Sequence, residues 1–351
     1  MRNLSVKTKI FVLIGAALIG TTTCANGADR GAIHAACFTP ASLAATAGEI
    51  KPVRGASGSQ IGPPVVQLGD PIPLPPNLRG AIRRVELPKG RKLIALTLDL
   101  CEQPGEVAGY DGPIIDYLRA TGTQATLFTG GKWLMSHGNR AQQLLSDPLF
   151  EIGGHGWAHR NVRTLSGAAL VDELVNPHRA YRRVRADLGA KSCTVGAGGL
   201  ASVPDRITLH RFAYGACNPA ALQAAADNGL ASVQWDVSTG DPAASQSAHA
   251  IADAMLRNTR PGSIIIAHAN GRGHHTAEAL PLAIPKLKAM GYEFVTVSAL
   301  LAAGKPVISD TCYDSRPGDT DKYDFLFSKR PSLPGAANNG WKPATTATVP
   351  R

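Results

Sequence analysis

The sequence predicts an α/β protein whose central part is a (β/α) barrel with seven strands. Between residues 91 and 304, short apolar runs of strand length alternate with longer segments that have helical periodicity. This alternation is typical of parallel strands joined by helices. Seven such runs are present, and the common barrel of this type has eight strands. An open, doubly wound sheet is the alternative architecture for the same pattern.

Each predicted strand is a short run rich in apolar residues. The runs are residues 93–98, 124–128, 150–152, 209–212, 232–235, 263–267 and 293–297. The helical candidates lie between them and place apolar residues at helical spacing. They are residues 113–120, 139–145, 166–188, 219–228, 247–257 and 276–290.

The first 28 residues resemble a secretory signal peptide. Arg2, Lys7 and Lys9 form a positive segment, and the apolar run that follows, residues 10–19, is too short to span a bilayer. Small residues come next, as a cleavage site requires. We expect an exported protein, periplasmic or secreted, with no stable membrane span after cleavage. An uncleaved N-terminal anchor is the alternative.

The segments on either side of the central domain have a different composition. Residues 29–90 are rich in Ala, Gly and Pro and predict an extension and linker, whereas residues 305–351 are polar and predict an irregular tail. The central region, residues 91–304, contains the motifs described below.

The charge of the chain favours anionic partners. The formal net charge is +10, and it falls to +7 without residues 1–28, which contain three positive charges and no negative one. Outside the cytoplasm, a basic surface attracts acidic polysaccharides, cell-wall polymers or lipid headgroups. We expect no nucleic acid partner, because no Lys/Arg run has interleaved aromatic residues.

Cysteine usage permits disulfides but does not fix their pairing. Of the six cysteines, Cys24 lies in the predicted signal peptide, and the odd number that remains leaves at least one thiol unpaired. We expect one or two bridges. Cys101 and Cys217 each lie within three residues of a motif residue described below, so they either form a disulfide between two site loops or are inert thiols.

Polar residues follow the predicted strands at their carboxyl ends, where a parallel barrel has its active site. These residues are Asp99, His155, His159, Arg211, Tyr214, Asp236 and His268. His155 and His159 are four residues apart, and imidazole is the commonest protein ligand of zinc, so the pair is a candidate metal site.

Five segments in this order resemble the motifs of the polysaccharide deacetylases that share the NodB-homology domain. They are Ala95-Leu-Thr-Leu-Asp99, His155-Gly-Trp-Ala-His159, His210-Arg-Phe-Ala-Tyr-Gly215, Trp235-Asp-Val-Ser-Thr-Gly-Asp241 and Gly262-Ser-Ile-Ile-Ile-Ala-His268. The resemblance covers residues 91–304 and implies a distorted barrel of the NodB-homology type.

The resemblance also implies roles for individual residues. Asp99 is the expected catalytic base, Arg211 orients it, and His268 is the general acid. His155 and His159 bind a divalent metal, for which we expect zinc, with cobalt, nickel or manganese as alternatives. The expected substrate-binding residues are Tyr214, Trp235, Asp236 and Asp241.

The sequence departs from the family pattern at the third metal ligand. The family usually has a second aspartate directly after the base, but Leu100 stands there and cannot bind a metal. Glu102 is the expected replacement, and Cys101 is an alternative sulfur ligand. The remaining possibilities are that Asp99 itself binds the metal or that there is no third protein ligand. Ser238 also replaces one aspartate of the fourth motif.

These residues predict a metal-dependent hydrolase that removes N-acetyl groups from a polysaccharide or a peptidoglycan-like cell-wall glycan. Two alternatives remain: a non-catalytic or impaired glycan-binding relative, and an amidohydrolase that cleaves small non-sugar amides on the same fold. Release of acetate from N-acetylated oligosaccharides would distinguish the predicted deacetylase from both alternatives.

Overall fold

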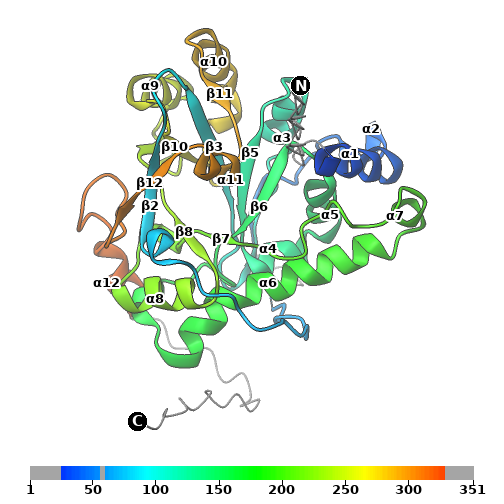
Figure 1. Cartoon of the computed structure of the whole chain (residues 1–351), viewed down its shortest axis with the longest axis horizontal. Coiled ribbons are helices and arrows are strands. Elements are labelled where there is room, and N and C mark those ends of the chain that lie inside the picture. Colours follow the sequence, from blue (N-terminus) through cyan, green and yellow to red (C-terminus); the bar gives the residue numbers. More distant parts are fainter. Residues whose placement is uncertain (1–24, 56–59, 329–351) are drawn as a thin grey trace, which may run out of the picture.

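The computed structural model describes residues 25–55 and 60–328 (Figure 1). The predicted signal peptide falls almost entirely on residues 1–24, outside this part. Among the described residues, no helix is both long and apolar enough to cross a membrane.

The strands and helices alternate through the middle of the chain as predicted. The strands are β1 (Val53–Arg54), β2 (Ala81–Glu86), β3 (Leu93–Leu100), β4 (Glu106–Val107), β5 (Ala125–Thr129), β6 (Phe150–Gly154), β7 (Leu209–His210), β8 (Ala231–Val233), β9 (Val237–Ser238), β10 (Ile264–His268), β11 (Glu293–Phe294) and β12 (Lys305–Ser309). The helices are α1 (Ala25–Cys37), α2 (Pro40–Leu43), α3 (Gly112–Ala120), α4 (Gly131–Ser136), α5 (Gly138–Ser146), α6 (Gly167–Gly189), α7 (Ser192–Gly196), α8 (Pro219–Asp227), α9 (Ala248–Asn258), α10 (Thr276–Ala289), α11 (Val297–Ala302) and α12 (Lys322–Ser328).

The centre of the fold is one curled sheet of ten strands. Its strand order is β12-β2-β8-β7-β6-β5-β3-β10-β9, with β11 also paired to β3. All pairs are parallel except β12 with β2. Arg84 on β2 also bridges to Ser263, directly before β10, and the strands form a distorted barrel with helices outside (Figure 1). The predicted fold class is confirmed.

Strand β3 shows how the apolar residues divide between two layers. Leu96, Leu98 and Leu100 pack in the hydrophobic cluster that includes helices α3 and α10. Ala95 and Leu93 pack instead with Phe128 and Trp235 inside the curled sheet. Alternate residues of a strand point to opposite faces, so the odd-numbered residues of β3 face the interior of the barrel. This register decides which side chains can reach the active site.

The flanking segments are more ordered than their composition predicts. Strand β2 lies within the predicted linker, and β12 and α12 lie within the predicted irregular tail. Composition gave little sign of β2 because two arginines interrupt its apolar pattern, yet Arg83 is only 7% exposed. Its guanidinium stacks 3.8 Å from the centre of the Tyr313 ring, beyond β12. The two flanking segments therefore complete the sheet by pairing with each other.

Two disulfides attach the flanking segments to the domain. Cys37 pairs with Cys193, and Cys217 pairs with Cys312. The alternative of a bridge between Cys101 and Cys217 is wrong, and Cys101 is a buried free thiol. The pairing was not readable from the sequence, because each bridge joins segments that only the tertiary fold brings together.

Candidate active site

Asp99 lies at the carboxyl end of β3 and is 2% exposed. Its Oδ1 accepts a 2.8 Å hydrogen bond from Nη1 of Arg211, and its Oδ2 lies 3.3 Å from Nε2 of His155. Burial alone raises the pKa of Asp99, but the charge and hydrogen bond of Arg211 outweigh it and hold this pKa below its ordinary value. The carboxylate is therefore ionised near neutral pH, as a general base must be.

Arg211 is a fixed part of the site. It is fully buried, its Nε donates to the carbonyl of Val233, and its Nη2 donates to the carbonyl of Gln234. Its guanidinium lies 4.1 Å from the centre of the Phe128 ring. These contacts leave Nη1 directed at Asp99, so the predicted orienting role of Arg211 agrees with its geometry.

The two motif histidines lie side by side after β6, with ring centroids 4.9 Å apart. Nδ1 of His155 lies 2.8 Å from the carbonyl oxygen of Arg211, and a carbonyl only accepts, so this nitrogen carries the proton. Nε2 of His155 and Nδ1 of His159 are buried and have no hydrogen-bond partner. Burial lowers the pKa of both imidazoles, which favours the neutral form that binds metals.

The sulfur of Cys101 completes a group of three donors. One potential ligand atom from each of Cys101, His155 and His159 lies within 4.8 Å of the other two. A tetrahedral zinc ion needs ligand atoms about 3.3–3.6 Å apart, given bonds of about 2.0–2.3 Å, so modest side-chain adjustment closes the set. The chemistry of the donors fits a divalent ion such as zinc or cobalt.

Glu102 is not part of this group. Its Oε2 accepts hydrogen bonds from Ser136 Oγ and the Ala108 N–H, and its Oε1 lies 3.5 Å from Nζ of Lys132. The side chain therefore points toward helix α4, away from the histidines. The prediction of Glu102 as the third ligand is not supported, because these contacts hold its carboxylate and it does not belong to the donor group formed with the histidines.

His268 ends β10 beside Asp99 in the parallel register. Its Nδ1 lies 2.9 Å from Oδ1 of Asp241. Burial lowers the pKa of His268, but the charge and hydrogen bond of Asp241 outweigh it, and the net direction is upward. A histidine that stays protonated near neutral pH is suited to act as a general acid.

Asp241 supports His268 and does not face a substrate. It is fully buried, and its Oδ2 accepts hydrogen bonds from the His268 N–H and from Thr276 Oγ1. Thr239 donates to its Oδ1. The predicted substrate contact is therefore not supported, because the carboxylate is fully buried and both of its oxygens are held by hydrogen bonds from protein groups.

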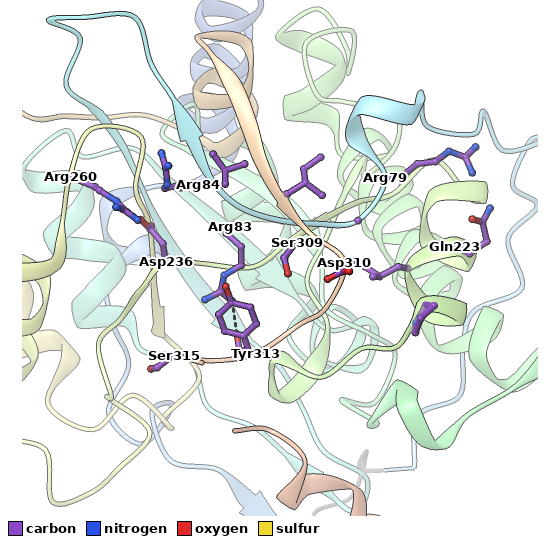
Figure 2. A pocket seen from close by; sticks show the side chains of 15 residues that line it. Arg79, Arg83, Arg84, Gln223, Asp236, Arg260, Ser309, Asp310, Tyr313 and Ser315 are labelled. Carbon is purple, nitrogen blue, oxygen red and sulfur yellow. Dashed lines mark hydrogen bonds and ion pairs between the residues drawn. The ribbon is translucent and has the colours of Figure 1, made fainter. Parts of the chain in front are cut away.

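Asp236 lies at the wrong end of β10 for the predicted role. Its carboxylate accepts hydrogen bonds from the Ile264 N–H and Ser263 Oγ, at the strand's amino end, whereas His268 lies at the carboxyl end. Figure 2 shows Asp236 beside Arg260 on the wall of a separate cavity of about 1030 Å³. A substrate contact by Asp236 beside His268 is not supported, because Asp236 precedes β9, which runs parallel to β10 toward its carboxyl end.

Trp235 has a structural position. It is 4% exposed, and its indole N–H donates to Oδ1 of Asp314 in the C-terminal segment. The Arg211 guanidinium lies 5.3 Å from the centre of its ring. The indole therefore stabilises Arg211 from behind, and it offers little surface for stacking on a sugar.

Tyr214 forms one wall of the site. It adopts a left-handed backbone conformation with φ of 60°, and its ring centroid is 4.3 Å from that of His159. Among the described residues, the other non-glycine positions with positive φ are His159 and His275, which also belong to site loops. Strained backbone of this kind is commonly found at functional sites.

Comparison with known proteins agrees with this geometry. Residues 86–194 match the family described as polysaccharide deacetylase. Over this segment the chain matches the polysaccharide deacetylase family. The family and enzyme class predicted from the five motifs, a hydrolase of carbon–nitrogen bonds, are confirmed at this level.

Several curated relatives of the deacetylase domain have related names. A peptidoglycan-N-acetylglucosamine deacetylase from Bacillus cereus is 27% identical over 220 residues, covering 62% of this chain and 91% of the relative. A protein of the same name from Listeria monocytogenes is 27% identical over 245 residues, 68% of this chain but only 46% of the relative. A chitooligosaccharide deacetylase from Rhizobium leguminosarum bv. phaseoli is 25% identical over 51% of this chain and 69% of its own length.

Solved structures show the same fold. A peptidoglycan N-acetylglucosamine deacetylase crystallised with an N-oxidanyl-benzamide superposes with a TM-score of 0.53 at 24% identity, over 65% of this chain and 95% of the other. A CE4 family pseudoenzyme from Bacillus anthracis superposes with a TM-score of 0.51 at 23% identity, over 64% and 69% of the two chains.

Some residues around the deacetylase site could not be found by motif comparison. Asn270 donates a hydrogen bond to the Cys101 sulfur, and Tyr323 of α12 packs 4.9 Å from Tyr214, centroid to centroid. Asn270 is two residues after His268, and this proximity to a motif residue could have indicated that it lies at the site. Tyr323 lies in the predicted irregular tail, so nothing in the sequence connected it with the site. The position of Cys101 was readable from strand alternation.

Proposed function

We propose that this protein is a metal-dependent hydrolase that removes N-acetyl groups from a cell-wall glycan or a related polysaccharide. One observation carries the proposal. An ionised aspartate, Asp99, lies 3.3 Å from Nε2 of His155, which together with His159 and Cys101 forms a donor set for a divalent ion. The names of the curated relatives support N-acetylated glucosamine polymers as the substrate class.

His155 and His159 would hold the metal. A divalent ion bound there would lower the pKa of water toward neutrality and polarise an amide carbonyl. Of the expected ions, zinc and cobalt suit this set of nitrogen and sulfur donors best.

The residues of the chain supply the proton transfers. Asp99, aimed by Arg211, accepts a proton from the attacking water as the new carbon–oxygen bond forms. The backbone N–H of Tyr214 is the candidate donor to the developing oxyanion. His268 then gives its proton to the leaving nitrogen as the carbon–nitrogen bond breaks, so that the products are acetate and an amino sugar.

We further propose that the protein is exported and acts outside the cytoplasm. The two disulfides support this location, because such bridges persist in oxidising compartments and are rare in the cytosol. The N-terminal positive and apolar segments described above support it as well. A fusion of residues 1–28 to a reporter that folds only after export would test the proposal, and retention of the reporter in the cytoplasm would contradict it.

Acetate release tests the proposed reaction. The full chain, loaded in turn with zinc, cobalt, nickel or manganese, should release acetate from N-acetylglucosamine oligomers or peptidoglycan, and the Asp99→Asn variant should not. Glycan binding without acetate in any metal form would overturn the proposal and favour a non-catalytic binding protein. Turnover of small non-sugar amides alone would favour a different amidohydrolase.

A further inference from the structure

We propose that Cys101 is the third protein ligand of the metal, which makes this a Cys-His-His site that prefers zinc and cobalt to manganese. The inference deepens the proposed function, because it concerns the ion at that same site. The family resemblance implies an aspartate ligand at position 100, where this chain has Leu100, and Cys101 would replace that ligand. The arguments are the placement of the sulfur, the contacts that orient it and the unpartnered nitrogens beside it.

The register of β3 places Cys101 on the catalytic side. Asp99 and Cys101 are two residues apart and share one face of the extended chain. Leu100 between them is fully buried in the apolar cluster that faces the helices. A carboxylate at position 100 would enter that apolar cluster. Position 101, two residues after Asp99, can instead present a ligand to the histidines.

Contacts around the sulfur hold it in place. Nδ2 of Asn270 donates to the Cys101 sulfur at 3.3 Å and to the Cys101 carbonyl oxygen at 2.8 Å. Asn270 is itself fully buried. Hydrogen bonds of this kind orient the side chains that bind a metal.

One ring nitrogen of each of the two histidines lacks a hydrogen-bond partner. Nε2 of His155, whose residue is 1% exposed, makes no hydrogen bond, and neither does the buried Nδ1 of His159. Because Nδ1 of His155 donates to a carbonyl, Nε2 presents a lone pair toward Oδ2 of Asp99, 3.3 Å away. Two electron-rich atoms at this distance are stabilised by a cation close by, and unsatisfied buried polar atoms are otherwise costly.

The identity of the donor has consequences for the ion. A thiolate carries one negative charge, as a carboxylate does, so the net charge of the ligand set is preserved. Sulfur is a softer ligand than oxygen and favours zinc over manganese. The remaining cysteines of the described part are in disulfides, so a thiolate signal from this part of the chain comes from Cys101 alone.

Cobalt substitution gives a direct test. The full chain with Cys24→Ser, which removes the thiol outside the described residues, is loaded with cobalt(II). We expect a near-ultraviolet thiolate-to-cobalt charge-transfer band that is absent in the Cys101→Ser variant. Zinc affinity, measured by competition with a chelator, should fall by at least about 100-fold in Cys101→Ser, more than the roughly 10- to 100-fold expected for Asn270→Ala, which removes only an outer-shell contact.

Three outcomes separate the two proposals. A cobalt form without the thiolate band, or unchanged zinc affinity in Cys101→Ser, overturns the ligand assignment even if acetate is released. A thiolate band without acetate release supports the ligand and overturns the proposed reaction. Circular dichroism of each variant confirms folding, and Asn270→Ala provides a second variant if Cys101→Ser does not fold.

Discussion

The carboxylate of Asp99, the proposed catalytic base, takes its properties from two neighbours. Arg211 is held by two backbone carbonyls and an aromatic ring, so its remaining nitrogen reaches Asp99 without further ordering. His155 approaches the other carboxylate oxygen. The same aspartate in a solvated loop would have neither the low pKa nor the fixed direction.

Replacing Asp99 by asparagine tests its role as the base. Asn keeps the shape and cannot accept the proton, so kcat for acetate release should fall about 10²- to 10⁴-fold, with zinc content unchanged by elemental analysis. Asp253→Asn, an exposed surface change on α9, is the matched control. Because Asn leaves the buried Arg211 unpaired, the melting temperature must be measured as well. Full activity would show that the base is another group.

Removing the charge of Asp241 tests the assignment of His268 as the acid. Asp241 raises the pKa of His268, and the protonated form is lost as pH rises through that raised value. Asp241→Asn should lower the pKa of His268, so the basic limb of the kcat–pH profile should move to lower pH. The acidic limb, which belongs to Asp99, should stay in place. An unchanged basic limb would remove His268 from the role of acid.

At the scale of elements, strand β3 determines the site. Its even-numbered residues pack against helices, and its odd-numbered residues point into the barrel. Asp99 and Cys101 are therefore presented together, while Leu100 and Glu102 point to the helical side. The first motif therefore lacks the usual aspartate at position 100, but Cys101 still places a donor atom near the histidines.

Restoring the aspartate of the family at position 100 should harm this protein. Leu100→Asp places a carboxylate in a fully buried apolar cluster, so the free energy of unfolding should fall by about 3 kcal/mol or more. Zinc affinity should not rise. Leu100→Met, a change of similar volume, should cost less than about 1.5 kcal/mol. Denaturant titration measures the first effect, and a stable variant with tighter zinc binding would contradict the register argued for β3.

At the scale of the whole molecule, both ends of the described chain brace the barrel. Strand β12 covers β2, the Cys217–Cys312 bridge fixes the segment that follows, and α12 places Tyr323 against Tyr214. Arg163, next to the histidine loop, pairs with Asp324 of α12. The C-terminal segment is thus part of the site wall.

Truncation after Gly304 tests this bracing. It removes β12, α12 and one disulfide, and loss of a native disulfide alone typically costs about 2–5 kcal/mol. We expect a lower melting temperature and reduced acetate release. Truncation after Ser328, which keeps every described residue, is the control. Equal melting temperatures for the two truncations would show that the C-terminal strand and helix contribute nothing to stability.

The sequence by itself determined the family, seven of the ten strands of the sheet and the grouping of Asp99, His155, Arg211 and His268 at strand ends. These follow from local signals, because strand alternation and motif spacing are carried by neighbouring residues. The tertiary structure alone decided the disulfide pairing, the supporting role of Asp241, the distant position of Asp236 and the approach of Tyr323. Each depends on contacts between segments far apart in the chain, which no local pattern encodes. The choice of Cys101 over Glu102 as the metal ligand depends on both sources. Strand alternation indicates which side chains share a face with Asp99, but only the folded chain shows that the histidines lie beside the sulfur.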